Sequence, residues 1–338
     1  MDFQPAIQAI RAGQTAPVYT IFGSEQYLRD QLLEALRQAT ESDGESDRLT
    51  LDLNEQALMD AIDEANMFSF FADQRLILAW NANFATSQGS KLEKHEEKAL
   101  EEYLKNPNKA SVLVFVIPGD QLDKRRKGSK LLQKHSTFVD ITPMDEGQVQ
   151  RYVQTYIANS NLDMTREAVG ELLRRVDGQL SQAMHELEKL ESYHSLGRRI
   201  TLDVVEDLVP RTLESDVFEL SNAVVTKQID RAIQIYQDLR LMKHEPIALH
   251  ALIVSQFRIM IQTKLLAQEG MMEGQIASHL GVHPYRVKLA MQSVRQMPFE
   301  ELVDFYNQLV EADYGMKTGV GDQESHFYLL LTRLMEMK

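Results

Sequence analysis

The sequence contains no cysteine, and this absence removes several kinds of chemistry. Without thiols there is no disulfide framework, no thiolate metal site and no cysteine nucleophile. Apolar runs are short, and none approaches the roughly 18 residues that a membrane-spanning helix needs. The first residues, 1–5, lack the basic and then apolar order of a signal peptide. We therefore expect a cytoplasmic protein that does not enter a membrane.

Positive charge is in short supply, since 36 Lys and Arg stand against 50 Asp and Glu, for a net charge of −14. Such a surface repels the DNA backbone on average, so tight duplex binding would require a strongly segregated basic patch. The acidic balance favours solubility or a protein partner. The length of 338 residues predicts two or three domains.

The first part of the chain alternates between strand and helix patterns. Short apolar, β-rich runs are separated by stretches with helical periodicity, and they occur at residues 18–22, 48–53, 76–80, 112–117 and 138–141. Strands that alternate with helices of this length predict a parallel sheet with right-handed crossovers. We expect an α/β domain over residues 1–142, with the polar stretch 81–98 as a solvated loop that continues into a charged helix.

The strand pattern disappears after Pro143. Short helices are expected over residues 143–211 and longer ones over residues 212–338. In the longer set, apolar residues recur every four positions and predict an amphipathic stripe that faces a helical core: Leu249, Ile253, Phe257, Ile261 and Leu265. The pattern therefore divides the chain into three domains.

The turn after the first predicted strand lacks the residues that bind a nucleotide. A phosphate-binding loop needs two glycines, a lysine and a hydroxyl for Mg²⁺. Starting at Gly23, the sequence has Leu28 in place of the second glycine and then Arg29 and Asp30. The third and fourth strands are not followed by an Asp-Glu pair that would hold a metal and polarise water. This pattern argues against NTP hydrolysis, and the alternative is that Gly23 is merely a turn.

No other catalytic or metal signature is complete. His95 begins a zinc-helix pattern, but Ala99 stands where the second histidine would be. We therefore predict no catalytic residue, no metal and no cofactor for this chain.

An apolar cluster follows a helix that the pattern predicts over residues 55–64. Its members are Met67, Phe68, Phe70 and Phe71. If the helix continues through it, Met67, Phe70 and Phe71 share one face and Phe68 points elsewhere. The cluster is either a buried helix–strand corner or an exposed aromatic wedge that enters a pocket on a partner.

Two further segments have a common structural explanation and a rarer functional one. The densest basic run is Lys124, Arg125, Arg126 and Lys127, which is either a solvated helix start or a contact to DNA phosphates. Residues 275–288, with a glycine in the middle, resemble a helix-turn-helix. That motif would make the protein a DNA-binding regulator, although such helical corners are common in all-α domains.

Taken together, several segments resemble the delta subunits of bacterial DNA polymerase III clamp loaders. The segments keep their order over essentially the whole chain, at residues 18–28, 68–75, 114–125, 187–190, 217–220, 245–248, 280–288 and 311–319. No single segment is as specific as an intact nucleotide-binding motif, but the ordered set is.

The resemblance implies an AAA+-type, P-loop-NTPase-like α/β domain, a small helical lid and an all-α C-terminal collar. It implies that Phe70 and Phe71 bind the beta sliding clamp, with Met67 and Phe68 beside them; Phe70 stands where many relatives carry Leu. It also implies a collar that packs against the gamma/tau and delta-prime subunits, and primed DNA within the complex. Such a subunit opens the clamp without hydrolysing ATP, as part of the DNA polymerase III holoenzyme, a nucleotidyltransferase complex.

Overall fold

The computed structural model describes residues 3–41, 47–68, 74–282, 284–295 and 297–336. The chain divides into two compact units, Met1–Met144 and Asp145–Lys338. In the described part of the chain, no helix combines the length and the hydropathy that crossing a bilayer would take.

The first unit contains a five-stranded parallel sheet in the order β2-β3-β4-β1-β5. The strands are β1 (Val18–Phe22), β2 (Asp47–Asp52), β3 (Arg75–Trp80), β4 (Ser111–Ile117) and β5 (Thr137–Asp140). Every residue of β1 and β4 is buried, as expected for central strands of a parallel sheet that is covered on both faces.

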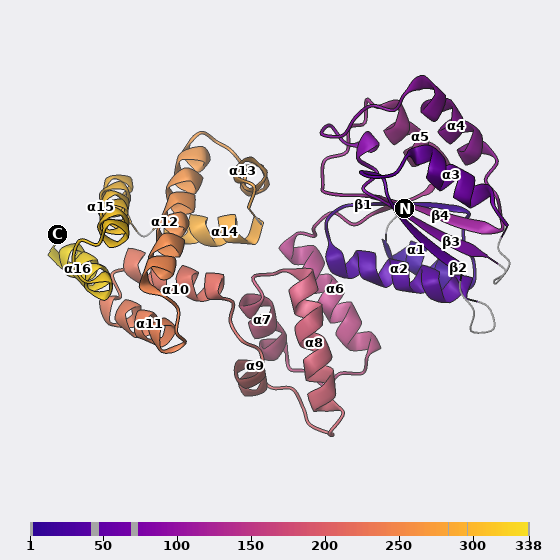
Figure 1. The fold of residues 1–338 in the computed structure, drawn as a ribbon. Coiled ribbons are helices and arrows are strands. Elements are labelled where there is room, and N and C mark those ends of the chain that lie inside the picture. The colour runs from indigo at the N-terminus through magenta and orange to yellow at the C-terminus, as the bar shows by residue number, and fades with distance from the viewer. Residues whose placement is uncertain (1–2, 42–46, 69–73, 283, 296, 337–338) are drawn as a thin grey trace. The chain divides into compact units, whose positions relative to one another are not determined.

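Helices cover both faces of this sheet (Figure 1). On one face lie α1 (Phe3–Arg11) and α2 (Gln26–Thr40), and on the other lie α3 (Leu58–Asn66), α4 (Lys94–Lys105) and α5 (Lys127–His135). Residues four apart on α2, Leu28, Leu32 and Leu36, are fully buried, so this helix presents one apolar stripe to the sheet. The result is a three-layer α/β/α arrangement.

The second unit is helical throughout its described residues. The first helices pack on one another: α6 (Glu146–Asn159), α7 (Arg166–Arg175), α8 (Leu180–His194) and α9 (Leu202–Leu208). Six of the remaining helices surround one core: α10 (Leu213–Val225), α11 (Ile229–Leu241), α12 (Pro246–Gln268), α14 (Pro284–Ser293), α15 (Phe299–Thr318) and α16 (Gln323–Glu336). Helix α13 (Glu273–Leu280) packs with α14 in a smaller separate cluster.

The predicted fold class is confirmed: a parallel α/β part is followed by an all-helical part. The predicted stripe on α12 is buried at Leu249, Ile253 and Phe257, whereas Leu265 at its end is exposed. The solvated loop expected from residue 81 onward is wrong at Phe84, which is buried because the short helix η1 (Asn83–Ala85) turns it into the core. A separation of the second unit near residue 211 stays a prediction.

Candidate functional site

The turn between β1 and α2 is in close contact with the backbone that follows β5. Gly23 has a φ of +129°, and a Cβ there would lie 2.3 Å from the carbonyl carbon of Ile141. Only glycine fits this approach of two backbones. The backbone N–H of Glu25 donates to the Ile141 oxygen at 3.0 Å, and Leu28 is buried in the core. The turn therefore joins β1 to the end of β5.

The carboxylate of Asp120 occupies the hydrogen-bond donors of this turn. The backbone N–H of Ser24 donates to Asp120 Oδ1 at 2.9 Å, and the Ser24 hydroxyl donates to Oδ2 at 2.8 Å. Backbone N–H and hydroxyl groups at such a turn are the donors that hold phosphate in nucleotide-binding loops. An internal carboxylate thus sits where an anion would bind. Sequence reasoning missed this pair because nothing local connects residues so far apart.

The other two residues of the predicted degenerate loop have local partners. Arg29 Nε lies 3.2 Å from Asp30 Oδ1. The Arg29 guanidinium also lies 5.4 Å from the centre of the Trp80 ring, at the end of β3. The Asp30 carboxylate therefore forms an ion pair with a neighbour on its own helix, α2.

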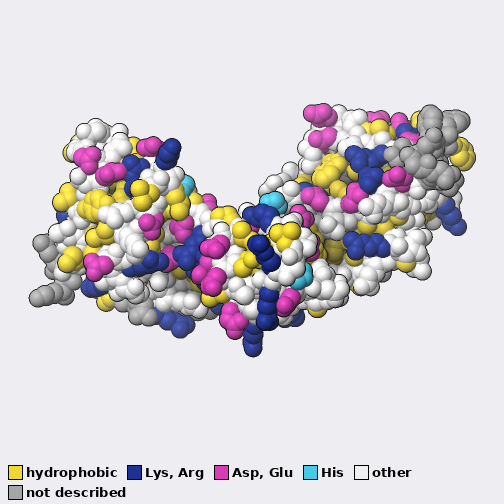
Figure 2. Space-filling model, turned by 90° about the horizontal axis from the view of Figure 1, so that it is seen from below, with side chains coloured by type: hydrophobic (Ala, Val, Ile, Leu, Met, Phe, Trp, Pro, Cys, Tyr) yellow, Lys and Arg dark blue, Asp and Glu magenta, His cyan; other side chains and the backbone are white. Residues whose placement is uncertain are grey.

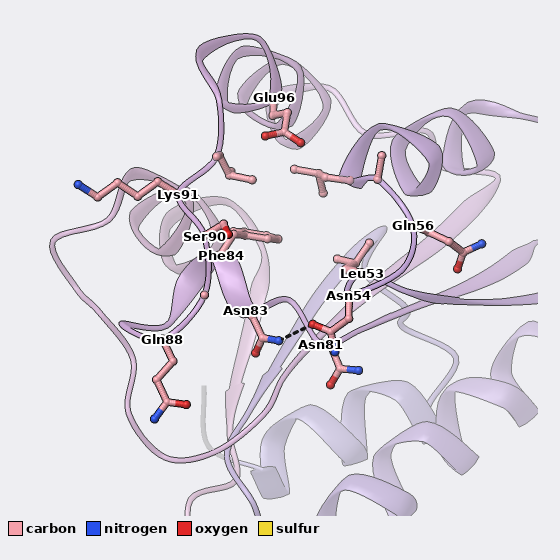
Figure 3. Close-up of a pocket in the computed structure, with 14 residues that line it drawn as sticks. Leu53, Asn54, Gln56, Asn81, Asn83, Phe84, Gln88, Ser90, Lys91 and Glu96 are labelled. Carbon is pink, nitrogen blue, oxygen red and sulfur yellow. Dashed lines mark hydrogen bonds between the residues drawn. The ribbon is translucent and has the colours of Figure 1, made fainter.

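A pocket of about 520 Å³ lies at the carboxyl ends of β2 and β3 (Figure 3). Asn81 has a φ of 60°, and its Nδ2 donates to Asp52 Oδ1 at 2.8 Å, which lowers the pKa of that carboxyl. Asn83 Nδ2 donates to Asn54 Oδ1 at 2.8 Å. Neutral amides thus follow β3, where an NTPase carries metal-binding carboxylates. Within the described ranges, no cluster of three or more His, Asp or Glu residues is placed to hold a metal.

In the basic run, Arg126 is turned into the protein. Its side chain is 12% exposed. The guanidinium donates to three backbone oxygens, those of Phe84 at 3.4 Å, Ser87 at 3.1 Å and Ser90 at 3.0 Å. The side chain therefore holds the loop that follows η1.

The other members of the run differ in their partners. Lys127 Nζ lies 3.5 Å from Glu97 and 3.3 Å from Glu101 on α4. Arg125 is paired with Asp123 but is 91% exposed, and Lys124 is exposed as well. On the face drawn in Figure 2, basic and acidic side chains are interspersed. Among the described residues, Lys124 and Arg125 reach solvent without a partner on another helix, whereas Lys127 is exposed but paired with α4.

The apolar cluster after α3 falls partly within the described residues. Phe70 and Phe71 lie outside them. Met67 is 51% exposed and Phe68 is 77% exposed. The backbone N–H of Met67 donates to the oxygen of Glu64, and the backbone is extended at Met67, with a ψ of 152°. The helix thus ends before the cluster, and the two described side chains lie on the surface.

The helix-turn-helix geometry is present in α13 and α14, with Gly281 between them at a φ of 66°. The second helix contacts other parts of the same unit, however. Lys288 pairs with Glu146 on α6, and the Tyr285 ring lies beside Gly178, which precedes α8. A recognition helix would present these side chains to base edges in the major groove. The structure therefore explains the motif as a helical corner.

A parallel α/β unit with a phosphate-loop-like turn, followed by a long helical unit, is of the P-loop-NTPase-like class. The family described as DNA polymerase III, delta subunit, matches residues 19–142, and the C-terminal domain of the DNA polymerase III delta subunit matches residues 214–334.

Individual relatives match this chain over most or nearly all of its length. The DNA polymerase III subunit delta of Bacillus subtilis is 36% identical over 333 residues, which are 97% of this chain and 96% of the relative. The probable DNA polymerase III subunit delta of Aquifex aeolicus is 22% identical over 82% of this chain and 79% of its own. The solved structure of the Bacillus subtilis DNA clamp loader delta protein superposes with a TM-score of 0.82, at 34% identity and 99% coverage of both chains. This chain belongs to the DNA polymerase III delta subunit family.

Proposed function

We propose that this chain binds the beta sliding clamp, opens the ring and helps to load it on primed DNA without hydrolysing ATP itself. The contact is made by Phe70 and Phe71, with Met67 and Phe68 beside them. The observation that carries the proposal is the exposure of Met67 and Phe68, at 51% and 77%, at the start of this segment in a chain of the delta family.

Apolar side chains in water favour association with an apolar pocket. Two phenylalanines bury on the order of 300–500 Å² together, which gives roughly 8–12 kcal/mol gross at about 25 cal/mol per Å². The loss of translational and rotational freedom consumes a large part of this sum. Burial of the two phenylalanines is therefore sufficient for a specific contact with the clamp. Most of the chain's surface remains available to other partners.

Ring opening follows if the chain binds a strained clamp conformation better than the closed ring. A ligand shifts such an equilibrium only by its differential affinity for the two states. A wedge that enters a pocket near the protomer interface supplies that difference, so that one interface of the ring opens. The clamp closes again once it is loaded on primed DNA.

ATP acts through the partner subunits in this proposal. The internal Asp120–Ser24 pair, the buried Leu28 and the amides after β3 support a nucleotide-free role for this chain. Residues 212–338 serve as the collar that packs against the gamma/tau and delta-prime subunits, and residues 143–211 form a small helical lid before it. Exposed apolar side chains on α15 and α16, such as Val310 and Leu329, suit a protein partner. We place the assembled loader in the cytoplasm.

The basic run provides a second proposed contact, to primed DNA within the assembled complex. Lys124 and Arg125 reach solvent, so they are the candidate contacts to the phosphates of primed DNA. Arg126 and Lys127 are engaged with the protein's own carbonyl and carboxylate oxygens.

The double change Phe70→Ala with Phe71→Ala tests the proposed clamp contact. Truncation of buried aromatic anchors typically costs ~2–4 kcal/mol each, so clamp affinity is expected to fall at least about a hundredfold. The dissociation constant is measured with purified clamp, and a thermal melt is recorded for the variant.

The matched control is Leu241→Ala with Met242→Ala, which removes two adjacent exposed apolar side chains at the end of α11. This control is expected to bind the clamp like the natural chain. Unchanged clamp affinity of the phenylalanine variant would refute the proposal, and a collapsed melt would show that the pair belongs to the core.

A further inference from the structure

One side chain contacts the protein on both sides of the proposed clamp-binding segment. Arg75 is the first residue of β3, directly after the segment. Its Nη1 lies 2.8 Å from Glu64 Oε2, in the last turn of α3 before the segment, and its Nε lies 3.2 Å from Asp47 Oδ1 at the start of β2. The Arg75 side chain is 16% exposed. A largely buried ion-pair group thus joins the helix that precedes the segment to the strand that follows it.

Hydrogen bonds to residues 108–110, which lead into β4, fix the same two ends. Asn108 Nδ2 donates to the oxygen of Ala65 at 3.0 Å, before the segment. After the segment, Gln74 Nε2 donates to the oxygen of Lys109 at 3.1 Å, and the Arg75 N–H donates to the oxygen of Ala110 at 2.9 Å. Both ends of the segment are therefore hydrogen-bonded to the residues that lead into β4.

We propose that Arg75 is a positioning residue for clamp binding, an inference that rests on the proposed function. By tying Glu64 to β3, it holds the ends of the segment together and restricts the directions in which the segment leaves the domain. A binding element whose two ends are held together loses less conformational freedom on binding. The planar guanidinium contacts two carboxylates at once, and a lysine ammonium is a poor substitute in such a place.

The variant Arg75→Met tests the inference, because it keeps an apolar stem and removes both ion pairs. We expect the affinity for purified clamp to fall roughly tenfold, since segment ordering is then included in the binding free energy. Arg75→Lys should give an intermediate affinity. Arg37→Met is the matched control, because Arg37 also pairs with two glutamates, Glu34 and Glu41, but on α2, and it should leave clamp affinity unchanged.

Two synthetic peptides of residues 66–75, one with Arg and one with Met at the last position, separate positioning from direct contact. A positioning residue has no role outside the folded domain, so both peptides should bind the clamp equally and more weakly than the protein. If the Met peptide is weaker by the same factor as the Arg75→Met protein, Arg75 contacts the clamp itself and the inference is overturned. Unchanged affinity of the folded Arg75→Met protein overturns it as well.

The same series distinguishes this inference from the proposed function. If Phe70→Ala with Phe71→Ala leaves clamp affinity intact, the proposed function fails. If that variant loses binding while Arg75→Met retains it, only the positioning inference fails. Should Arg75→Met not fold, Glu64→Gln removes one ion pair and leaves Asp47 with its partner; it should weaken clamp binding severalfold, and natural affinity in this variant would contradict the inference.

Discussion

Asp120 gives the β1–α2 turn a negative charge of the protein's own. Its two carboxylate oxygens accept from the N–H and the hydroxyl of one residue, Ser24. A phosphate at this place would have to displace the carboxylate and would then lie close to its charge. Asp30, one turn into α2, adds a second acidic side chain near the same helix start. The two hydrogen-bond donors of Ser24 in this turn thus have acceptors without a nucleotide.

The variant Asp120→Ala tests this account of the turn. We expect the free energy of unfolding to fall by about 1–2 kcal/mol, because two hydrogen bonds are lost. ATP titration should show no saturable micromolar binding in either the natural chain or the variant, since Leu28 and Asp30 remain. Urea unfolding and calorimetric titration measure the two quantities.

The control for this experiment is Asp322→Ala. It removes a similar carboxylate pair, to the N–H and hydroxyl of Ser325, at the start of α16 in the second unit. Saturable micromolar ATP binding by the natural chain would contradict the nucleotide-free role of the β1–α2 turn.

Among the helices, α12 has a buried titratable group near its start. His250 is 1% exposed, and its Nε2 lies 2.8 Å from the oxygen of Leu309 on α15, so the ring donates a hydrogen bond across the two helices. Its Nδ1 has no hydrogen-bond partner among the described residues. Burial lowers the pKa of His250, because a second ring proton would be placed where no acceptor lies.

This lowered pKa predicts acid sensitivity of the second unit. The folded-state pKa lies below the ordinary value of about 6.5, so as pH falls the unfolded chain takes up the proton first. The stabilising contribution of neutral His250 is complete above that value and is lost as pH falls below it. Between about pH 7.5 and about pH 5.5, His250→Gln should therefore lose less stability than the natural chain.

The control for the histidine experiment is His194→Gln, since His194 is an exposed histidine at the end of α8 that also contacts a backbone oxygen. It should show the natural pH dependence in urea unfolding. An unaltered pH dependence in His250→Gln would show that His250 does not titrate differently in the folded state.

Most elements could be predicted from local patterns, whereas the contacts at the site could not. The strand Val18–Phe22 has the predicted bounds, because its apolar run and the turn residue that ends it lie within a few positions of one another. The pairing of Ser24 with Asp120, and of Arg75 with Asp47, joins residues that only the parallel sheet brings together. Helical periodicity was also no guide to Met67, because the helix ends just before it.

At the scale of the whole molecule, two units with separate cores suit two different tasks. The α/β unit carries the segment that we propose to bind the clamp, and the helical unit is proposed to pack against the sibling subunits. The net charge of −14 argues against strong DNA binding by the chain alone. Contact with primed DNA is therefore expected only within the assembled complex.

Clamp opening without nucleotide is tested most directly by energy transfer across the protomer interface of a labelled clamp. On addition of the natural chain in the absence of ATP, the transfer should fall and saturate in parallel with binding. It should remain high with the variant that carries Phe70→Ala and Phe71→Ala. If the transfer stays unchanged while the natural chain is fully bound, the chain binds the clamp without opening it, and the proposed ring opening is contradicted.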